Sequence, residues 1–148
     1  QVMGVFHPDL VGIQARVLQR LGSRHVLVVN GSDGLDEITI SGPTNIAELK
    51  DGEVSEYIVT PQDFGLKATP LDSIRVATVE EAKAMLLSVL DNQPGAARDI
   101  VQLNAGAAIY TAGLSATLAE GVRKAAEVIA SGAAKHKLAQ LIAISHEA

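Results

Sequence analysis

The first part of the chain shows two different hydrophobic patterns. Four apolar residues recur at the spacing of one helix face: Val11, Ala15, Leu18 and Leu21. This spacing predicts a helix over residues 8–21, which begins at a proline and is stopped by Gly22. The next apolar residues form an unbroken run at 25–29, which is typical of a strand covered on both faces, as parallel strands are. Together with the apolar segment 4–6, these patterns predict a strand-helix-strand unit.

A period of two replaces the helical period beyond the next turn. Three short segments, 38–40, 45–49 and 56–59, alternate apolar and polar residues and are separated by turn residues. We therefore expect three short, antiparallel strands. Only the run at 25–29 reads as fully buried, and a parallel sheet needs strands on both sides of such a run. Its partner strands are therefore expected in sequence outside this chain.

Helical patterns return after a connector at 61–72. Thr78 and Glu81 match a capping box, which predicts the start of a helix. Its apolar residues are expected to face inward: Ala82, Met85, Leu86 and Val89. Three further helices are predicted before the C-terminus. The predicted fold class is therefore α/β in one domain, with a strand-helix-strand unit and short strands over 1–72 and a helical cluster over 73–148.

Composition and charge narrow the classes of partner. The 148 residues carry a net charge of -5 and no basic run, so neither nucleic acid nor an anionic membrane surface is an expected partner. No stretch approaches the roughly 20 apolar residues of a membrane span, and the N-terminus lacks a signal-peptide pattern. The chain has no cysteine, which excludes disulfides and thiolate metal sites and agrees with a cytoplasmic location.

The densest group of turn residues follows the predicted buried strand. Residues 30–34 read Asn-Gly-Ser-Asp-Gly, and the acidic pair Asp36 and Glu37 follows closely. Open α/β sheets place ligand sites at such strand ends. Mg²⁺ is usually held by one or two carboxylates together with waters and substrate phosphates, so the pair is a candidate magnesium site. Spacing alone leaves a second interpretation open, in which these acidic residues only form a solvated turn.

Other candidate chemistry is weaker. Gly31 and Gly34 could let backbone N–H groups approach a phosphate, but their spacing matches neither a Walker motif nor a dinucleotide motif. The four histidines have no metal-ligand spacing, and no serine lies in a nucleophile elbow. We therefore assign no catalytic residue and no cofactor-binding residue. Asn104 and Tyr110 lie in a helical pattern, where packing or a hydrogen bond between helices is expected.

Five segments, in order along the chain, carry a resemblance to one known family. They are Gln-Val-Met-Gly-Val-Phe at 1–6, Val-Val-Asn-Gly-Ser-Asp-Gly-Leu-Asp-Glu at 28–37, Gly-Leu at 65–66, Leu-Asn-Ala-Gly-Ala-Ala-Ile-Tyr at 103–110, and Ile-Ala-Ser-Gly-Ala-Ala at 129–134. These segments resemble signatures of the anthranilate phosphoribosyltransferases, and the most specific element is Gly-x-Asp-Gly-x-Asp-Glu. One departure is Asn30, where the family commonly has histidine. The metal argument depends on neither residue.

The resemblance implies an activity and an architecture. The activity is transfer of phosphoribose from phosphoribosyl pyrophosphate to the amine of anthranilate, a step of tryptophan biosynthesis. The architecture is the C-terminal part of a phosphoribosyltransferase-like and nucleoside-phosphorylase-like α/β domain with a helical tail, within a two-domain homodimer. In that setting Asp36 and Glu37 are expected to bind Mg²⁺ carried by the pyrophosphate.

The resemblance also implies that part of the active site is not in this chain. The sequence starts at Gln1 without an initiator methionine, and the family's N-terminal helical domain and pyrophosphate loop are expected upstream. Proteolysis, deliberate shortening and nicking are all open as origins of this start. We expect no appreciable transferase activity from the chain alone. Two alternative functions stay open: a non-catalytic nucleic-acid-binding relative with the same fold, and a related pyrimidine nucleoside phosphorylase.

Overall fold

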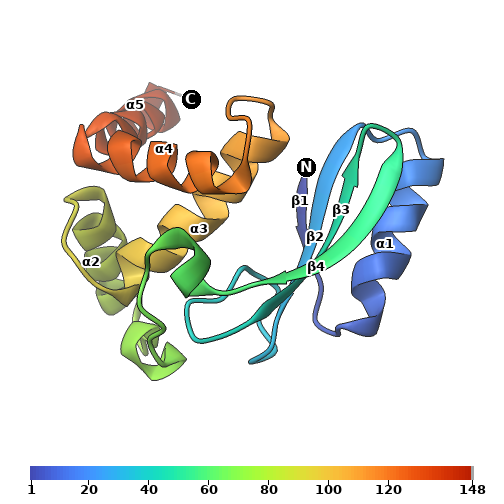
Figure 1. Cartoon of the computed structure of the whole chain (residues 1–148). Coiled ribbons are helices and arrows are strands. Elements are labelled where there is room, and N and C mark those ends of the chain that lie inside the picture. The colour runs from blue at the N-terminus through green and yellow to red at the C-terminus, as the bar shows by residue number, and fades with distance from the viewer. Residues whose placement is uncertain (148) are drawn as a thin grey trace.

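The molecule combines a small mixed sheet with helices (Figure 1). The computed structural model describes residues 1–147. The strands are β1 (Val2–Gly4), β2 (His25–Gly31), β3 (Thr44–Lys50) and β4 (Glu53–Val59). The helices are α1 (Asp9–Arg20), α2 (Val79–Leu90), α3 (Ala96–Thr111), α4 (Leu118–Ala130) and α5 (Ala133–Glu147), with short 3-10 turns η1 (Pro61–Phe64) and η2 (Leu71–Ile74). This order confirms an α/β part followed by a helical cluster.

The strands of the described residues lie in the order β1-β2-β3-β4. β1 pairs with β2 in parallel, whereas β3 pairs antiparallel with both β2 and β4. β2 is buried on both faces, as its unbroken apolar run predicts. The prediction that its partner strands lie outside this chain is wrong, because β1 and β3 flank it. The neighbour on one side is antiparallel and follows directly in sequence, so no missing parallel strand is needed there.

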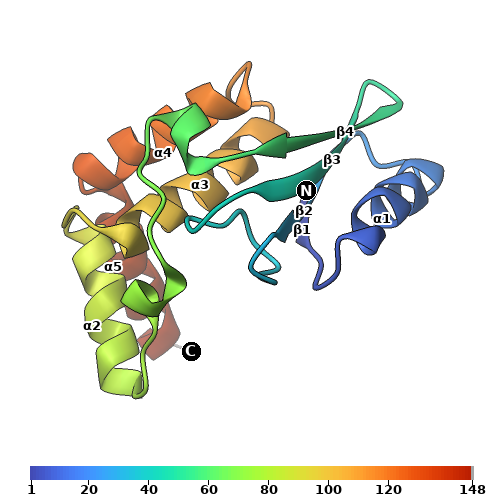
Figure 2. The same ribbon diagram turned by 60° about the horizontal axis from the view of Figure 1, so that its bottom comes forward.

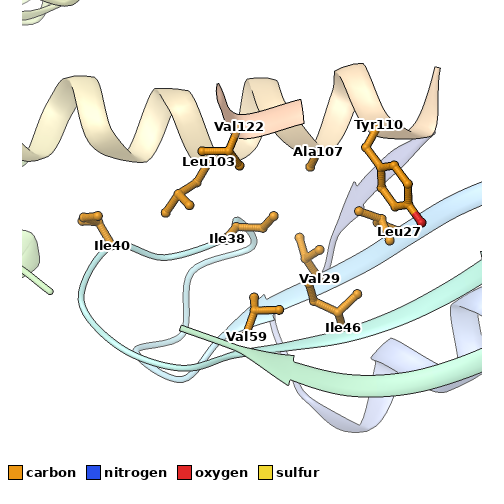
Figure 3. Packing of buried hydrophobic residues seen from close by; sticks show 10 residues of the cluster. All are labelled: Leu27, Val29, Ile38, Ile40, Ile46, Val59, Leu103, Ala107, Tyr110 and Val122. Atoms are coloured by element: carbon orange, nitrogen blue, oxygen red, sulfur yellow. The ribbon is translucent and has the colours of Figure 1, made fainter. Parts of the chain in front are cut away.

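The sheet is covered by a different helix on each face, because successive side chains of β2 point to opposite sides. Figure 2 shows α1 and α3 on opposite sides of the sheet. Val26 and Val28 join a buried cluster with residues of α1. Leu27 and Val29 join a second buried cluster with residues of α3, among them Leu103 (Figure 3). These contacts fix β2 in place, and with it the loop that begins where β2 ends.

Residues 38–40 do not form the strand that their alternating pattern predicts. The backbone N–H of Ile38 donates to the side chain of Asn104 at 2.9 Å, and the backbone N–H of Thr39 donates to the hydroxyl of Thr44 at 3.0 Å. Side chains therefore accept hydrogen bonds from backbone N–H groups that would otherwise pair with a neighbouring strand. All three residues are buried, so the apolar pattern here reports burial in a loop.

Two glycines bring α3 and α4 into backbone contact. A Cβ atom on Gly106 would lie 2.6 Å from the backbone N and Cα of Val122. A Cβ atom on Gly121 would lie 2.3 Å from the carbonyl oxygen of Gly106. Neither position accepts a larger residue without displacing a helix. α3 is therefore held both by α4 and by the sheet.

α2 leaves part of its apolar surface uncovered. The capping box at Thr78 and Glu81 is present and starts the helix, as predicted. Of the four residues expected to face inward only Val89 is buried, while Leu86 is 50% exposed. That prediction is wrong because η2 and α3 leave an apolar groove of about 470 Å³ against α2. None of the helices in residues 1–147 has both the length and the apolar character that crossing a membrane requires.

Candidate functional site

Asp36 and Glu37 lie in the loop that joins β2 to β3, beyond the C-terminal end of β2. Both residues are exposed. Neither forms an ion pair with another residue in the described part of the chain. Partial desolvation of the carboxyl, and then the charge of Asp36, raises the pKa of Glu37 above its ordinary value. The loop therefore presents two adjacent carboxylates without a protein cation to neutralise them.

Asp33 holds this loop from within. Its carboxylate accepts hydrogen bonds from the hydroxyls of Thr39 and Ser41, and from the backbone N–H of Leu35 at 3.1 Å. Burial acts to raise the pKa of Asp33, but the hydrogen bonds outweigh it and leave the pKa below its ordinary value. The charged form of Asp33 thus closes the loop on itself. The acidic pair lies inside the closed segment.

Gly4, the last residue of β1, lies against the backbone of Asp36. A Cβ atom on Gly4 would lie 1.7 Å from the carbonyl oxygen of Asp36 and 2.9 Å from its Cβ. Only glycine therefore allows the loop to approach β1 this closely. Nearby, the Nδ2 of Asn30, close to the C-terminal end of β2, donates to the carbonyl of Val5, the residue after β1, at 2.8 Å. β1 is thus one support of the acidic pair.

Asn104 of α3 is a second support of the loop. Its Oδ1 accepts from the N–H of Ile38 at 2.9 Å, and its Nδ2 donates to the carbonyl of Ile38 at 2.9 Å. Ile38 directly follows the acidic pair. The prediction of helix packing or a bond between helices at Asn104 is wrong, because the amide bonds a loop 66 residues away in the chain. An isolated polar amide between the buried residues Leu103 and Gly106 is the signal that could have identified it.

The backbone N–H groups of the loop glycines are used within the loop. Gly31 donates to the carbonyl of Leu35 at 2.8 Å, and Gly34 donates to the carbonyl of Gly31 at 2.9 Å. Gly34 has a φ of 92°, a left-handed conformation that favours glycine. These glycines therefore shape the turn, and their own N–H groups are already bonded within the loop.

The carboxylates of the loop suit a hard divalent cation that brings other ligands with it. Within residues 1–147 there is no cluster of three or more His, Cys, Asp or Glu residues that could enclose an ion. Mg²⁺ does not need such a cluster, since one or two carboxylates with waters and phosphate oxygens complete its octahedral shell. The exposed pair Asp36 and Glu37 fits this pattern. The metal assignment itself stays a prediction.

A second carboxylate, Glu48 of β3, has a contrasting environment. Its oxygens accept hydrogen bonds from the hydroxyls of Tyr110 at 2.7 Å and Tyr57 at 2.9 Å, and one lies 3.0 Å from the Nε2 of His25. The side chain is only 12% exposed. Burial acts to raise the pKa of Glu48, but these hydrogen bonds lower it below its ordinary value. The protein itself provides hydrogen-bond partners for both oxygens of this carboxylate, so the charge is satisfied without a ligand.

The chain is similar to proteins of one family in sequence. It matches the family described as "Glycosyl transferase family, a/b domain" over residues 1–135. The curated anthranilate phosphoribosyltransferase of Thiobacillus denitrificans is 62% identical over 148 residues, and that of Laribacter hongkongensis is 60% identical over 147 residues. The match covers 100% and 99% of this chain but only 43% of each relative. The chain thus spans less than half the length of these relatives.

Solved structures show the same similarity. The anthranilate phosphoribosyltransferase of Thermus thermophilus matches with a TM-score of 0.86 and 38% identity, over 95% of this chain and 41% of that one. The enzyme of Saccharomyces cerevisiae in complex with PRPP and Mg matches with a TM-score of 0.80 and 23% identity, over 93% of this chain and 40% of that one. The yeast likeness shows the fold alone. The Thermus likeness confirms the predicted α/β fold class.

Proposed function

This chain belongs to the glycosyl transferase family, and on that premise we propose that it supplies the metal-binding carboxylates of an anthranilate phosphoribosyltransferase. The whole protein would transfer phosphoribose from phosphoribosyl pyrophosphate to the amine of anthranilate, in tryptophan biosynthesis. Asp36 and Glu37 would hold the Mg²⁺ that accompanies the pyrophosphate. The two other functions considered from the sequence are not favoured, because the relatives described above carry the anthranilate activity in their names.

One observation carries the proposal. Asp36 and Glu37 are adjacent, exposed and without a cation partner among the described residues, yet the loop around them is held by the hydrogen bonds of Asp33. These hydrogen bonds hold the backbone that carries the pair. Two unneutralised carboxylates on a supported backbone are what an incoming cation with phosphate ligands requires.

The charge changes of the reaction explain why such a pair is useful. The departing pyrophosphate gains negative charge while the ribose carbon becomes electron-poor. Bound Mg²⁺ would neutralise the charge on the pyrophosphate. Asp36 and Glu37 would orient the ion through their carboxylate oxygens, and the closed loop would keep the backbone that carries both side chains in place. The contribution of this chain is therefore positioning and charge stabilisation, with no proton transfer assigned to it.

Substrates and partners follow from the relatives by analogy. Structures of the yeast enzyme are described in complex with PRPP and Mg and with 4-fluoroanthranilate. We propose the same substrate classes here. Since the chain spans 43% of the curated relatives, we propose that the remaining active-site groups belong to an N-terminal portion with a helical domain and a pyrophosphate loop. The homodimer and the cytoplasmic location stay predictions.

The experiment uses a chimera. This chain replaces the matching 148 residues of the Thiobacillus denitrificans relative, and anthranilate consumption is followed during a titration with Mg²⁺. The chimera should be active. The double variant Asp36→Asn with Glu37→Gln should lose on the order of 100- to 1,000-fold in kcat, as expected when a preorganised charge-stabilising contact is removed. Glu56→Gln, an exposed carboxylate of β4, is the matched control and should keep full activity.

The outcomes separate the parts of the proposal. Full activity and unchanged Mg²⁺ dependence in the double variant would show that the pair is a turn and not a metal site. A folded chimera that is inactive with anthranilate but active with another acceptor would show that the acceptor is wrong. Turnover above background by this chain alone would refute the prediction that it needs the remaining portion.

A further inference from the structure

Two elements far apart in the sequence contact the backbone of the acidic pair and of the residue that follows it. Gly4 of β1 lies against the backbone of Asp36. Asn104 of α3 bonds both backbone groups of Ile38. Glu37 lies between these two contacts in sequence. Asp33 is a third support, but it belongs to the same loop and cannot fix the loop relative to the rest of the fold.

We propose that Asn104 is a positioning residue for the metal-binding carboxylates and acts through the backbone of Ile38, with Gly4 as its counterpart at Asp36. This inference rests on the proposed function of the pair. Asn104 itself touches neither the ion nor the substrate. Its role is to set where the chain places the two carboxylates.

The chemistry of the amide explains why asparagine suits this position. A carboxamide has an acceptor and a donor side by side, and it therefore matches the N–H and the C=O of one residue. The N–H of Ile38 belongs to the peptide unit that joins it to Glu37, and that unit is planar. By accepting from this N–H at 2.9 Å, Asn104 fixes the orientation of the peptide plane that carries Glu37.

The side chain of Asn104 and the helix that carries it are themselves held in place. Its Nδ2 also donates to the carbonyl of Ile100, one turn earlier in α3, at 3.0 Å, which holds the amide in one orientation. Two residues further along, Gly106 is in backbone contact with α4. A shift of α3 would therefore have to displace α4 as well. Helix packing therefore fixes the position of Asn104, and the hydrogen bonds of Asn104 fix the position of the loop relative to α3.

The test compares Asn104→Ala with Val26→Ala. Val26 is buried near the N-terminal end of β2, in the cluster that packs against α1 rather than in the one that contains Ile38, so its variant controls for a general loss of stability. Hydrogen exchange of the Ile38 amide is measured by NMR, and the affinity for Mg²⁺ alone is measured by calorimetry. In Asn104→Ala, the Ile38 amide should exchange about tenfold faster or more, because its acceptor is gone. Mg²⁺ binding should weaken by on the order of tenfold, the usual effect of losing a group that orients a ligand.

The control should leave both readouts near those of the unchanged chain. Wild-type exchange at Ile38 in Asn104→Ala would overturn the inference. So would wild-type Mg²⁺ affinity, provided that Asp36→Asn with Glu37→Gln abolishes binding. If that double variant binds Mg²⁺ as well as the unchanged chain, the proposed function fails, and the exchange of Ile38 alone then decides whether Asn104 positions the pair.

Two further variants keep the inference testable if Asn104→Ala does not fold. Asn104→Gln retains the amide but lengthens the side chain, so both bonds to Ile38 cannot form with the observed geometry. It should show faster exchange at Ile38 and weaker Mg²⁺ binding, and wild-type values would overturn the inference. Gly4→Ala places a methyl group on the carbonyl oxygen of Asp36 and should weaken Mg²⁺ binding from the other contact. Unchanged binding there would remove Gly4 from the proposal.

Discussion

Two carboxylate sites lie along β2 and differ in what surrounds them. Glu48 is paired in register with Leu27, near the N-terminal end of β2, and accepts hydrogen bonds from two tyrosines beside His25. Asp36 and Glu37 follow the C-terminal end of the same strand, and the pKa of Glu37 carries no contribution from a hydrogen-bond donor. The pKa of Glu48 is lowered, whereas that of Glu37 is raised.

The difference shows how the surroundings of a carboxylate assign its role. At Glu48 the protein provides enough hydrogen bonds to outweigh burial, so the charge supports the fold. At the acidic pair the protein supports the backbone and leaves the charge to be neutralised from outside. Identical residue types therefore serve stability at one end of the strand and, as we propose, ligand binding at the other.

The largest effect that would test this comparison is the loss of Glu48. Glu48→Ala should lower the free energy of unfolding by about 3 kcal/mol, because it removes a charged acceptor and leaves the part-buried hydroxyls of Tyr57 and Tyr110 without an acceptor for their protons. Urea unfolding measures this value. Glu56→Ala is the control, since that exposed pair with Arg16 should contribute less than about 1 kcal/mol. If Glu48→Ala loses no more stability than Glu56→Ala, Glu48 does not support the fold and the difference between the two carboxylate sites is refuted.

A smaller effect is expected from one donor of the cluster. Tyr110→Phe should lower the free energy of unfolding by about 1 kcal/mol, because one hydrogen bond of 2.7 Å to Glu48 is lost while the ring stays packed. The hydroxyl also accepts from Lys50 at 3.1 Å. In the Glu48→Ala background the same substitution should cost much less, since its main partner is already absent. Full additivity in this double-mutant cycle would show that the two residues do not interact.

The smallest effect concerns Glu37 and its dependence on pH. Its folded pKa lies above the ordinary 4.5, so its contribution to stability is complete below pH 4.5 and is lost as pH rises through the folded value. Glu37→Gln should therefore raise stability at neutral pH, by at most about 0.5 kcal/mol because the group is exposed and screened. The gain should vanish below pH 4.5. Thermal unfolding at both pH values measures it, and a destabilised variant at neutral pH would contradict the prediction.

The pH dependence of Glu48 has the opposite sign and sharpens the comparison. Its folded pKa lies below the ordinary 4.5, so its contribution is complete above that value and is lost as pH falls through the folded pKa. The difference in stability between wild type and Glu48→Ala should therefore shrink in acid.

Much of this fold could be predicted from periodicity because most elements carry an apolar pattern of the expected period. The run at 25–29, the capping box at Thr78 and the helical pattern that contains Asn104 and Tyr110 all appear where the sequence places them. The position of the acidic pair at a strand end can be predicted as well, because turn residues and charge are local properties of the sequence.

The errors arise where the outcome depends on which residues distant in the chain come into contact and which do not. Residues 38–40 carry a strand pattern, but an amide from α3 takes the backbone groups that would pair. Leu86 carries a core pattern, but no described element covers it. The isolated amide of Asn104 indicates a polar contact, but nothing in a helical pattern reveals which loop provides its partner.

The separation between Asn104 and Ile38 has a consequence for the time course of folding. The bonds of Asp33 to Thr39 and Ser41 span at most 8 residues, so they can form as soon as this loop collapses. The bond between Ile38 and Asn104 spans 66 residues and must wait until α3 docks on the sheet. During synthesis the loop is therefore shaped first and oriented much later. The backbone that carries the carboxylates reaches its final position only after α3 has been synthesised and has packed on the sheet.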